Sequence, residues 1–153
     1  MTGMDATDRQ LVFLLQQDSR LPNAQLAEKL NISASACWRR VKALEQAGVI
    51  KRYAAVVDPK AMGLGFEAMV HVHLTRHDAS ALASFIRAIQ SRTEVTECFA
   101  TTGQADYHLR VLCRDIDAYN AFLESFLFLH PAVNSATTNV ILRQIKADAP
   151  ITG

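Results

Sequence analysis

The segment 23–48 restricts the fold of this chain more than any other, because it predicts two short helices separated by a tight break. In the second helix, Cys37, Val41 and Leu44 recur at helical spacing, which indicates one buried face. Ser33 precedes this helix, and its hydroxyl can accept a hydrogen bond from one of the first free backbone N–H groups. Two helices connected so closely are typical of a helix-turn-helix.

The face of the second helix opposite this apolar stripe is polar and basic, which suits a helix that lies in the major groove of DNA. Residues 33–52 contain five basic residues and one acidic residue, whereas the whole chain has a net charge of only +1. A local basic patch on a nearly neutral chain favours nucleic-acid binding over the alternative, a helical hairpin with a solvated charged face. The predicted DNA-binding residues are Ser33, Ser35, Trp38, Arg39, Arg40 and Lys42.

Two of these residues have a second interpretation. Arg40 stands beside the outer face, so it is also placed to pair with an acidic group of the protein. Trp38 lies between the buried and exposed faces, so core packing competes with DNA contact. Because arginine pairs bidentately with guanine edges, Arg39 and Arg40 are candidates for reading bases as well as for neutralising phosphates.

The bulk composition indicates a folded protein outside the membrane. At 153 residues and 50% hydrophobic, the chain can form one large domain or two small ones with a proper core. No run approaches the ~18 apolar residues of a membrane span, and the N-terminus lacks a signal-peptide pattern, so we expect a cytoplasmic protein. Cys37, Cys98 and Cys113 fit no disulfide or zinc pattern, and we expect all three in the core.

The N-terminal third continues the helical pattern around the helix-turn-helix. Asp5 can cap a helix that runs to about Gln17. Residues 49–57 predict a strand or an extended wing, and the glycines of the following stretch indicate a hinge. The predicted domains are a helix-turn-helix domain at 1–52, a strand and hinge linker at 53–65, and a second domain at 66–150.

The second domain has the element order of a ferredoxin-like βαββαβ fold, so the chain belongs to the α+β class. Its first strand, 66–75, alternates apolar and polar residues, which is typical of a sheet with one buried face. We expect both helices on one face of a four-stranded antiparallel sheet. The later predicted elements are a helix carrying Leu82, Phe85, Ile86 and Ile89, a strand at 95–102, a turn at 103–106, a strand at 107–113, a helix carrying Ile116, Tyr119, Phe122, Leu123 and Phe126, and a strand at 133–146.

The sheet face away from the helices needs a cover of its own. Its expected side chains include Met69, His71, His73, Leu112 and either Ile141 or Leu142, a set too apolar to be left in water. A second subunit is the expected cover, which also agrees with the two-fold dimers formed by helix-turn-helix proteins. A zinc site at His71, His73 and His77 is disfavoured, because no cysteine or carboxylate is placed to complete it.

Short motifs in a fixed order along the chain carry a resemblance to a known family. The matching residues are Met4-Asp5, Asp8 and Leu11-Val12 near the start; Ser33, Cys37, Arg40, Val41, Leu44, Gly48, Val49 and Ile50 in the second helix and after it; Tyr53 and Asp58-Pro59; and Gly103, Asp106, Tyr107 and Leu109 in the second domain. Each motif is weak by itself, but the ordered set is specific. The chain resembles the Lrp/AsnC family, the leucine-responsive or feast/famine transcription regulators, over nearly its whole length.

The resemblance implies an N-terminal DNA-binding domain and a C-terminal domain for effector sensing and oligomerisation. It further implies homodimers that assemble into tetramers or octamers, and small effectors, usually amino acids, bound between C-terminal domains. The turn from Gly103 to Tyr107 belongs to that pocket in similar proteins. Gln104 departs from the family, where an acidic residue is common, and this bears on which effector fits.

An amino-acid effector needs partners for an ammonium and a carboxylate. Asp106 can accept from the ammonium, and backbone N–H groups of the Gly103 turn can hold the carboxylate. The alternative is that Asp106 closes an Asx turn. The candidate effector-binding residues are Thr101, Thr102, Gly103, Gln104, Asp106, Tyr107 and Thr137.

The functional class expected from the sequence is a sequence-specific transcription regulator that responds to an amino acid, with no cofactor or metal. The alternatives are a nucleoid-type protein that organises DNA with little sequence preference, and a regulator without an effector. Catalysis is disfavoured, because the sequence shows no nucleophile beside a base, no phosphate-cradling glycine loop and no paired carboxylates.

Overall fold

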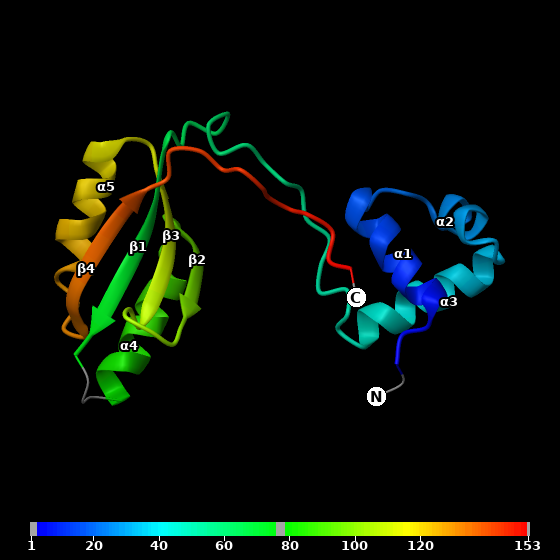
Figure 1. Cartoon of the computed structure of the whole chain (residues 1–153), viewed down its shortest axis with the longest axis horizontal. Helices are drawn as coiled ribbons and strands as arrows, with labels where there is room; N and C mark the ends of the chain where they lie inside the picture. The colour runs from blue at the N-terminus through cyan, green and yellow to red at the C-terminus, as the bar shows by residue number, and fades with distance from the viewer. Residues whose placement is uncertain (1–2, 76–78, 153) are drawn as a thin grey trace. The chain divides into compact units, whose positions relative to one another are not determined.

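The computed structural model describes residues 3–75 and 79–152, which form two compact units (Figure 1). The first unit comprises the chain up to Val56 together with the segment from Ile145 onward, and the second runs from Val57 to Gln144. The C-terminal segment joins the first unit through Gln16, whose amide oxygen accepts from the Ile151 N–H (2.8 Å) and whose amide nitrogen donates to the Ile151 carbonyl (3.1 Å).

The first unit contains three helices, α1 (Ala6–Gln17), α2 (Asn23–Leu30) and α3 (Ala34–Gln46). The break between α2 and α3 is short because Asn31 adopts a left-handed conformation (φ 54°), which ends α2 and reverses the chain. Ser33 then caps α3, since its hydroxyl oxygen accepts from the Ala36 N–H (3.2 Å). The predicted helix-turn-helix is therefore confirmed.

The core of the first unit fixes which face of α3 points outward. The buried side chains on α3 are those predicted from its spacing, and they pack against buried side chains of α1 and α2. Burial of such a stripe leaves only the opposite face of α3 for solvent or a ligand. The buried residues are Leu11, Leu15, Leu26, Ala27, Cys37, Val41 and Leu44.

The segment after α3 does not form the strand that the sequence suggested as one possibility. Gly48 adopts a positive φ of 71° and turns the chain, so that Ile50 packs against the core of the first unit. From Lys51 to Val57 the chain has no regular secondary structure and its side chains are exposed. A strand needs a neighbouring backbone to pair with, and none of the described residues supplies one.

The second unit has the predicted order of elements, strand-helix-strand-strand-helix-strand (Figure 1). Its four strands form one antiparallel sheet in the order β2-β3-β1-β4. The elements are β1 (Phe66–Leu74), α4 (Ala79–Gln90), β2 (Val95–Ala100), β3 (Tyr107–Cys113), α5 (Ile116–Phe122), a π-helical turn (Leu123–Leu127) and β4 (Val133–Val140).

Both helices cover the same face of the sheet, as the alternating pattern of β1 predicted. Val70 and Val72 of β1 are fully buried, in one cluster with Phe85 of α4 and Phe122 of α5. This apolar layer is the core of the second unit. Neither helix covers the opposite face of the sheet, which we call the open face. Among the described residues, no helix is long and apolar enough to cross a membrane.

Two expectations for this unit are wrong. The last strand ends at Val140 instead of residue 146, because β1 begins at Phe66 and offers almost no backbone beyond Glu67, whose carbonyl accepts from the Ile141 N–H (2.9 Å). Cys98 is exposed, because it lies on the edge strand β2, where the helices leave most side chains uncovered. Cys37 and Cys113 are buried as expected, and burial raises the pKa of both thiols.

Candidate functional site

The outer face of α3 presents a row of exposed polar side chains along the whole helix. Ser35, Arg39 and Lys42 lie on this row, as the sequence predicted. Gln46 continues the row at helical spacing and is also exposed, so it belongs to the same surface although sequence reasoning missed it. Its distance of four positions from Lys42 was the signal that would have found it. Arg39 makes no ion pair with any residue that the structure describes.

Arg40 points away from this row and into an ion-pair cluster at the start of α1. Its Nη1 atom donates to Asp5 Oδ2 (2.8 Å) and Asp8 Oδ1 (2.7 Å). The hydrogen bonds that the Arg40 guanidinium donates to Asp8 and Asp5 raise its pKa. The bond from the Asp8 backbone N–H, and then the bond from Arg40, lower the pKa of Asp5. Of its two interpretations, the structure shows the second: Arg40 ties α3 to α1.

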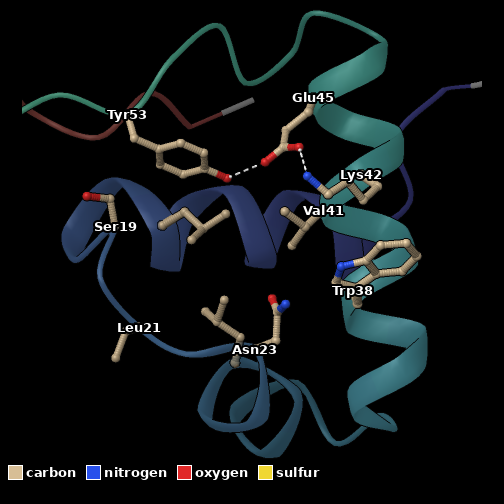
Figure 2. A pocket seen from close by; sticks show the side chains of 10 residues that line it. Ser19, Leu21, Asn23, Trp38, Val41, Lys42, Glu45 and Tyr53 are labelled. Carbon is tan, nitrogen blue, oxygen red and sulfur yellow. Dashed lines mark hydrogen bonds and ion pairs between the residues drawn. The ribbon is translucent and has the colours of Figure 1, made fainter.

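Lys42 is held by an acidic neighbour on the same helix. Its ammonium donates to Glu45 Oε2 (2.7 Å), and the Tyr53 hydroxyl donates to Glu45 Oε1 (3.0 Å) (Figure 2). Hydrogen bonds from Lys42 and Tyr53 lower the pKa of the Glu45 carboxyl, because both favour its ionised form. The Lys42 ammonium is therefore partly neutralised before any ligand arrives.

Trp38 belongs neither to the core nor to the centre of the outer row. Its side chain is 52% exposed and forms one wall of a hollow of about 270 Å³ between the three helices and Tyr53 (Figure 2). The hollow also meets Asn23 at the first turn of α2, where Pro22 leaves the helix without a side-chain cap. Uncapped N–H groups at a helix start favour phosphate oxygens. This side of α3 therefore places the ring of Trp38 at the same hollow as the start of α2, which has no side-chain cap.

In the second unit, Asp106 forms hydrogen bonds with the neighbouring strand β1 instead of closing a local turn. Its Oδ2 atom accepts from the Leu74 N–H (2.8 Å), and its own N–H donates to the Val72 carbonyl (3.0 Å). Both bonds attach the loop between β2 and β3 to the end of β1. The local Asx turn considered from the sequence is therefore not what the carboxylate makes, because its partner lies 32 positions away.

A chain of hydrogen bonds crosses the open face of the sheet next to this loop. The His108 Nε2 atom lies 2.8 Å from the Thr101 hydroxyl, and the Nδ1 atoms of His71 and His108 lie 2.6 Å apart. Asn139 Nδ2 lies 2.9 Å from His71 Nε2. If the Asn139 amide donates to His71 Nε2, then His71 Nδ1 donates to His108 Nδ1, and His108 Nε2 donates to the Thr101 hydroxyl. One proton on each imidazole therefore satisfies the whole chain.

The open face is more polar than the sequence suggested. Arg110 pairs with Glu67 (2.5 Å) and approaches Glu97 (3.8 Å), and half-buried Met69 lies between these groups and His71. The side chain of Phe99, on the edge strand, is 52% exposed. A mixed face of this kind resembles a protein interface more than a buried core.

The predicted effector residues lie at three places in the structure. Thr101, Thr102, Gly103 and Gln104 are exposed in the loop after β2, where Gly103 adopts a φ of 127°, and Asp106 anchors this loop. Thr137 lies on the open face, opposite His71 in the sheet register. Tyr107 points to the other face, where its ring packs on Phe85 (5.4 Å between centroids), so the structure does not bring it together with Thr137.

The histidines that the structure describes do not gather into a metal site. Among the residues that the structure describes, no group of three His, Cys, Asp or Glu side chains is placed to hold a metal ion. His77, the third histidine of the disfavoured zinc site, lies outside the described residues.

Family profiles match both halves of the chain. The winged helix-turn-helix DNA-binding profile matches residues 4–51, and the Lrp/AsnC ligand binding domain profile matches residues 67–151. Transcriptional regulator AzlB of Bacillus subtilis is 32% identical over 91% of this chain and 88% of its own length. The leucine-responsive regulatory protein of Salmonella typhimurium is 31% identical over 94% of this chain and 87% of its own length.

Solved structures of similar proteins share the whole fold. A transcriptional regulator from Neisseria meningitidis in complex with L-Met superimposes with a TM-score of 0.93 and 34% identity, over 97% of this chain and 96% of that one. AsnC of E. coli superimposes with a TM-score of 0.87 and 28% identity, over 95% and 96% of the two chains. The named relatives are regulators and not enzymes by their descriptions, and DecR of E. coli is a DNA-binding transcriptional activator. With a DNA-binding helix-turn-helix before a ligand-binding sheet domain, this chain belongs to the Lrp/AsnC family of transcription regulators.

Proposed function

We propose that this regulator recognises particular DNA sequences by laying the outer face of α3 in the major groove. The observation that carries the proposal is the row of Ser35, Arg39, Lys42 and Gln46, which is exposed while every apolar residue at core spacing on α3 is buried. Side chains on one helical face can reach consecutive base edges, and arginine and glutamine read guanine and adenine bidentately. Trp38 and the first turn of α2 contact the sugar-phosphate backbone of the DNA beside the groove.

In this proposal Ser33 and Arg40 support the interface from behind. Ser33 fixes the first turn of α3 by capping it. Arg40 fixes the angle between α3 and α1 through Asp5 and Asp8. Both residues therefore contribute to DNA binding by orienting the helix that carries Arg39.

Replacing Arg39 with Ala tests the proposal. Each phosphate contact that is lost reduces the slope of log affinity against log salt by about 0.9 for duplex DNA, and a lost base contact weakens only the specific sequence. We expect Arg39→Ala to weaken binding to the promoter region of the protein's own gene. Arg87→Ala, which removes an exposed charge from α4 of the second unit, is the control. Equal affinity and slope for the wild type and Arg39→Ala would refute the assignment.

Footprinting separates a regulator from a general DNA organiser. Protection confined to discrete segments of the promoter region supports sequence-specific binding. Uniform protection of promoter and random DNA at the same protein concentration would instead show that α3 contributes contacts without reading bases.

We propose further that the ligand of the second unit is an amino acid, bound at the loop 101–106. Support comes from the ligand-binding profile over this unit and from the similar Neisseria regulator, which was solved with L-Met. The exposed Gly103 turn suits the carboxylate of the ligand, and the carboxylate of Asp106 has acceptor capacity beyond its bond to Leu74. Calorimetric titration of the twenty amino acids tests this, and no binding heat from any of them would refute it.

We also propose that the open face of the sheet pairs with the same face of a second copy, and that such dimers assemble into tetramers or octamers. The ion pairs of Arg110 and the exposed ring of Phe99 give this face both polar and apolar partners for a two-fold contact. Sedimentation of the wild type and of Phe99→Asp measures the assembly. A wild-type protein that stays monomeric at micromolar concentration would refute the pairing.

A further inference from the structure

Glu45 occupies an unexpected place for an acid. It is the only acidic residue between positions 33 and 52, and it stands next to the basic row that faces DNA in the proposed function. A free carboxylate there would repel phosphates. In the structure it is not free, because one oxygen accepts from Lys42 (2.7 Å) and the other from Tyr53 (3.0 Å).

We propose that Glu45 is a positioning residue for Lys42. Its carboxylate binds the Lys42 ammonium, which would otherwise contact a DNA phosphate. Carboxylate and phosphate oxygens compete for the same ammonium donors. Non-specific DNA affinity is the sum of such phosphate contacts, so an internal carboxylate that occupies Lys42 removes one of them. Lys42 reaches DNA only where the fit of α3 outweighs its bond to Glu45, which raises the ratio of specific to non-specific binding.

The geometry around Glu45 supports this role over that of an ordinary surface ion pair. The side chain of Glu45 is only 28% exposed, compared with 48% for Lys42, so the carboxylate is the fixed partner and the ammonium the movable one. Tyr53 fixes the second oxygen from outside α3, at the start of the exposed segment that leads out of the first unit. Lys42 can therefore leave while Glu45 keeps its position through Tyr53.

The inference rests on the proposed function, and it is tested on random-sequence duplex DNA by fluorescence anisotropy between about 50 and 200 mM salt. Glu45→Gln keeps the size of the side chain and an acceptor for Tyr53 but weakens the hold on Lys42. We expect one more phosphate contact and a slope steeper by about 0.9, so that affinity falls about 3.5-fold further across this range than for the wild type. Glu28→Gln, at an exposed glutamate of α2, removes the same charge and should leave the slope unchanged.

Replacing Lys42 with Met gives an independent readout. If Glu45 holds Lys42 away from random DNA, Lys42→Met leaves the slope on that DNA as in the wild type. The double variant should behave like Lys42→Met alone, because Glu45 acts through Lys42. Circular dichroism of each variant confirms that the helices are kept.

Three results would overturn the assignment: an unchanged slope for Glu45→Gln, an equal steepening in the Lys42→Met background, or a slope that falls by about 0.9 in Lys42→Met alone. Absence of any DNA binding by the wild type is a different outcome. It would refute the proposed function itself, from which the role of Glu45 follows.

Discussion

Asp106 can attach the loop 101–106 to β1 and can also bind the ammonium of a ligand. Two substitutions of Asp106 distinguish these roles. In the structure its carboxylate accepts from the Leu74 N–H at 2.8 Å and so fastens the loop 101–106 to the end of β1. In the proposed function the same carboxylate also accepts from the ammonium of an amino acid. Asparagine keeps an oxygen for Leu74 but removes the negative charge, whereas alanine removes both.

The two variants should therefore differ in stability. A hydrogen bond to a charged group contributes about 1.5–3 kcal/mol, and the half-buried position of this one favours the lower end. Asp106→Ala should destabilise the second unit by about 1.5 kcal/mol, which lowers the melting temperature by roughly 6–12 °C for a domain of this size. Asp106→Asn should lose about half as much, because a neutral acceptor makes a bond about half as strong.

Ligand binding should not separate the two variants in this way, because both of them lose the negative charge. Loss of the charge facing an ammonium removes a bond of about 1.5–3 kcal/mol, or a factor of about 10–100 in affinity, so Asp106→Asn should already bind an amino acid weakly. Calorimetry and thermal unfolding of both variants measure the two effects. Asp117→Asn, at an exposed position of α5, is the charge-matched control. Wild-type affinity in Asp106→Asn would refute the ammonium contact, and wild-type stability in Asp106→Ala would refute the structural one.

Three further predictions concern the scaffold. Phe85→Ala should cost about 3–5 kcal/mol and unfold the second unit while the helical signal of α1–α3 persists, because Phe85 is fully buried between α4 and the sheet; two separate calorimetric transitions would show this. The Ala118 backbone N–H, then Arg114, lowers the pKa of Asp115 below its ordinary value of 3.8. Ionised Asp115 therefore stabilises the folded protein above pH 3.8, and this stabilisation is lost as the pH falls through the lowered pKa of the folded state. Asp115→Asn should make the free energy of unfolding fall less steeply at acid pH. Cys98 should react with a thiol reagent in the folded protein, while Cys37 and Cys113 react only on unfolding.

The periodicity of the sequence was sufficient to predict most of the fold. Spacing on α3 identified its buried stripe, and alternation in β1 identified the face that α4 and α5 cover. Both patterns arise because burial selects apolar residues at the repeat of the element itself. Pairing between strands has no such signature, so the end of β4 was misplaced by several residues.

The candidate sites were less predictable than the elements that carry them. The hydrogen bond from the Leu74 N–H to Asp106 joins β1 to the loop before β3, and the contact between His71 and His108 joins β1 to β3. Neither can be predicted without the register of the sheet. Sequence spacing can assign a polar residue to a face, but not the partner that meets it there. For this reason the turn at Gly103 was found, whereas the attachment of its loop to β1 was not.

Arg39 and Arg40 show how sharply geometry divides neighbours of identical chemistry. Successive residues of an α-helix point about 100° apart, because the helix has 3.6 residues per turn. That rotation leaves Arg39 on the exposed row and carries Arg40 to the side where α1 begins. There the carboxylates that cap α1 also bind the guanidinium, so one cluster both starts a helix and fixes the angle of the next. A basic residue on a recognition helix therefore contributes to DNA affinity only after the acids within the protein have been counted, and the same argument applies to Lys42 beside Glu45.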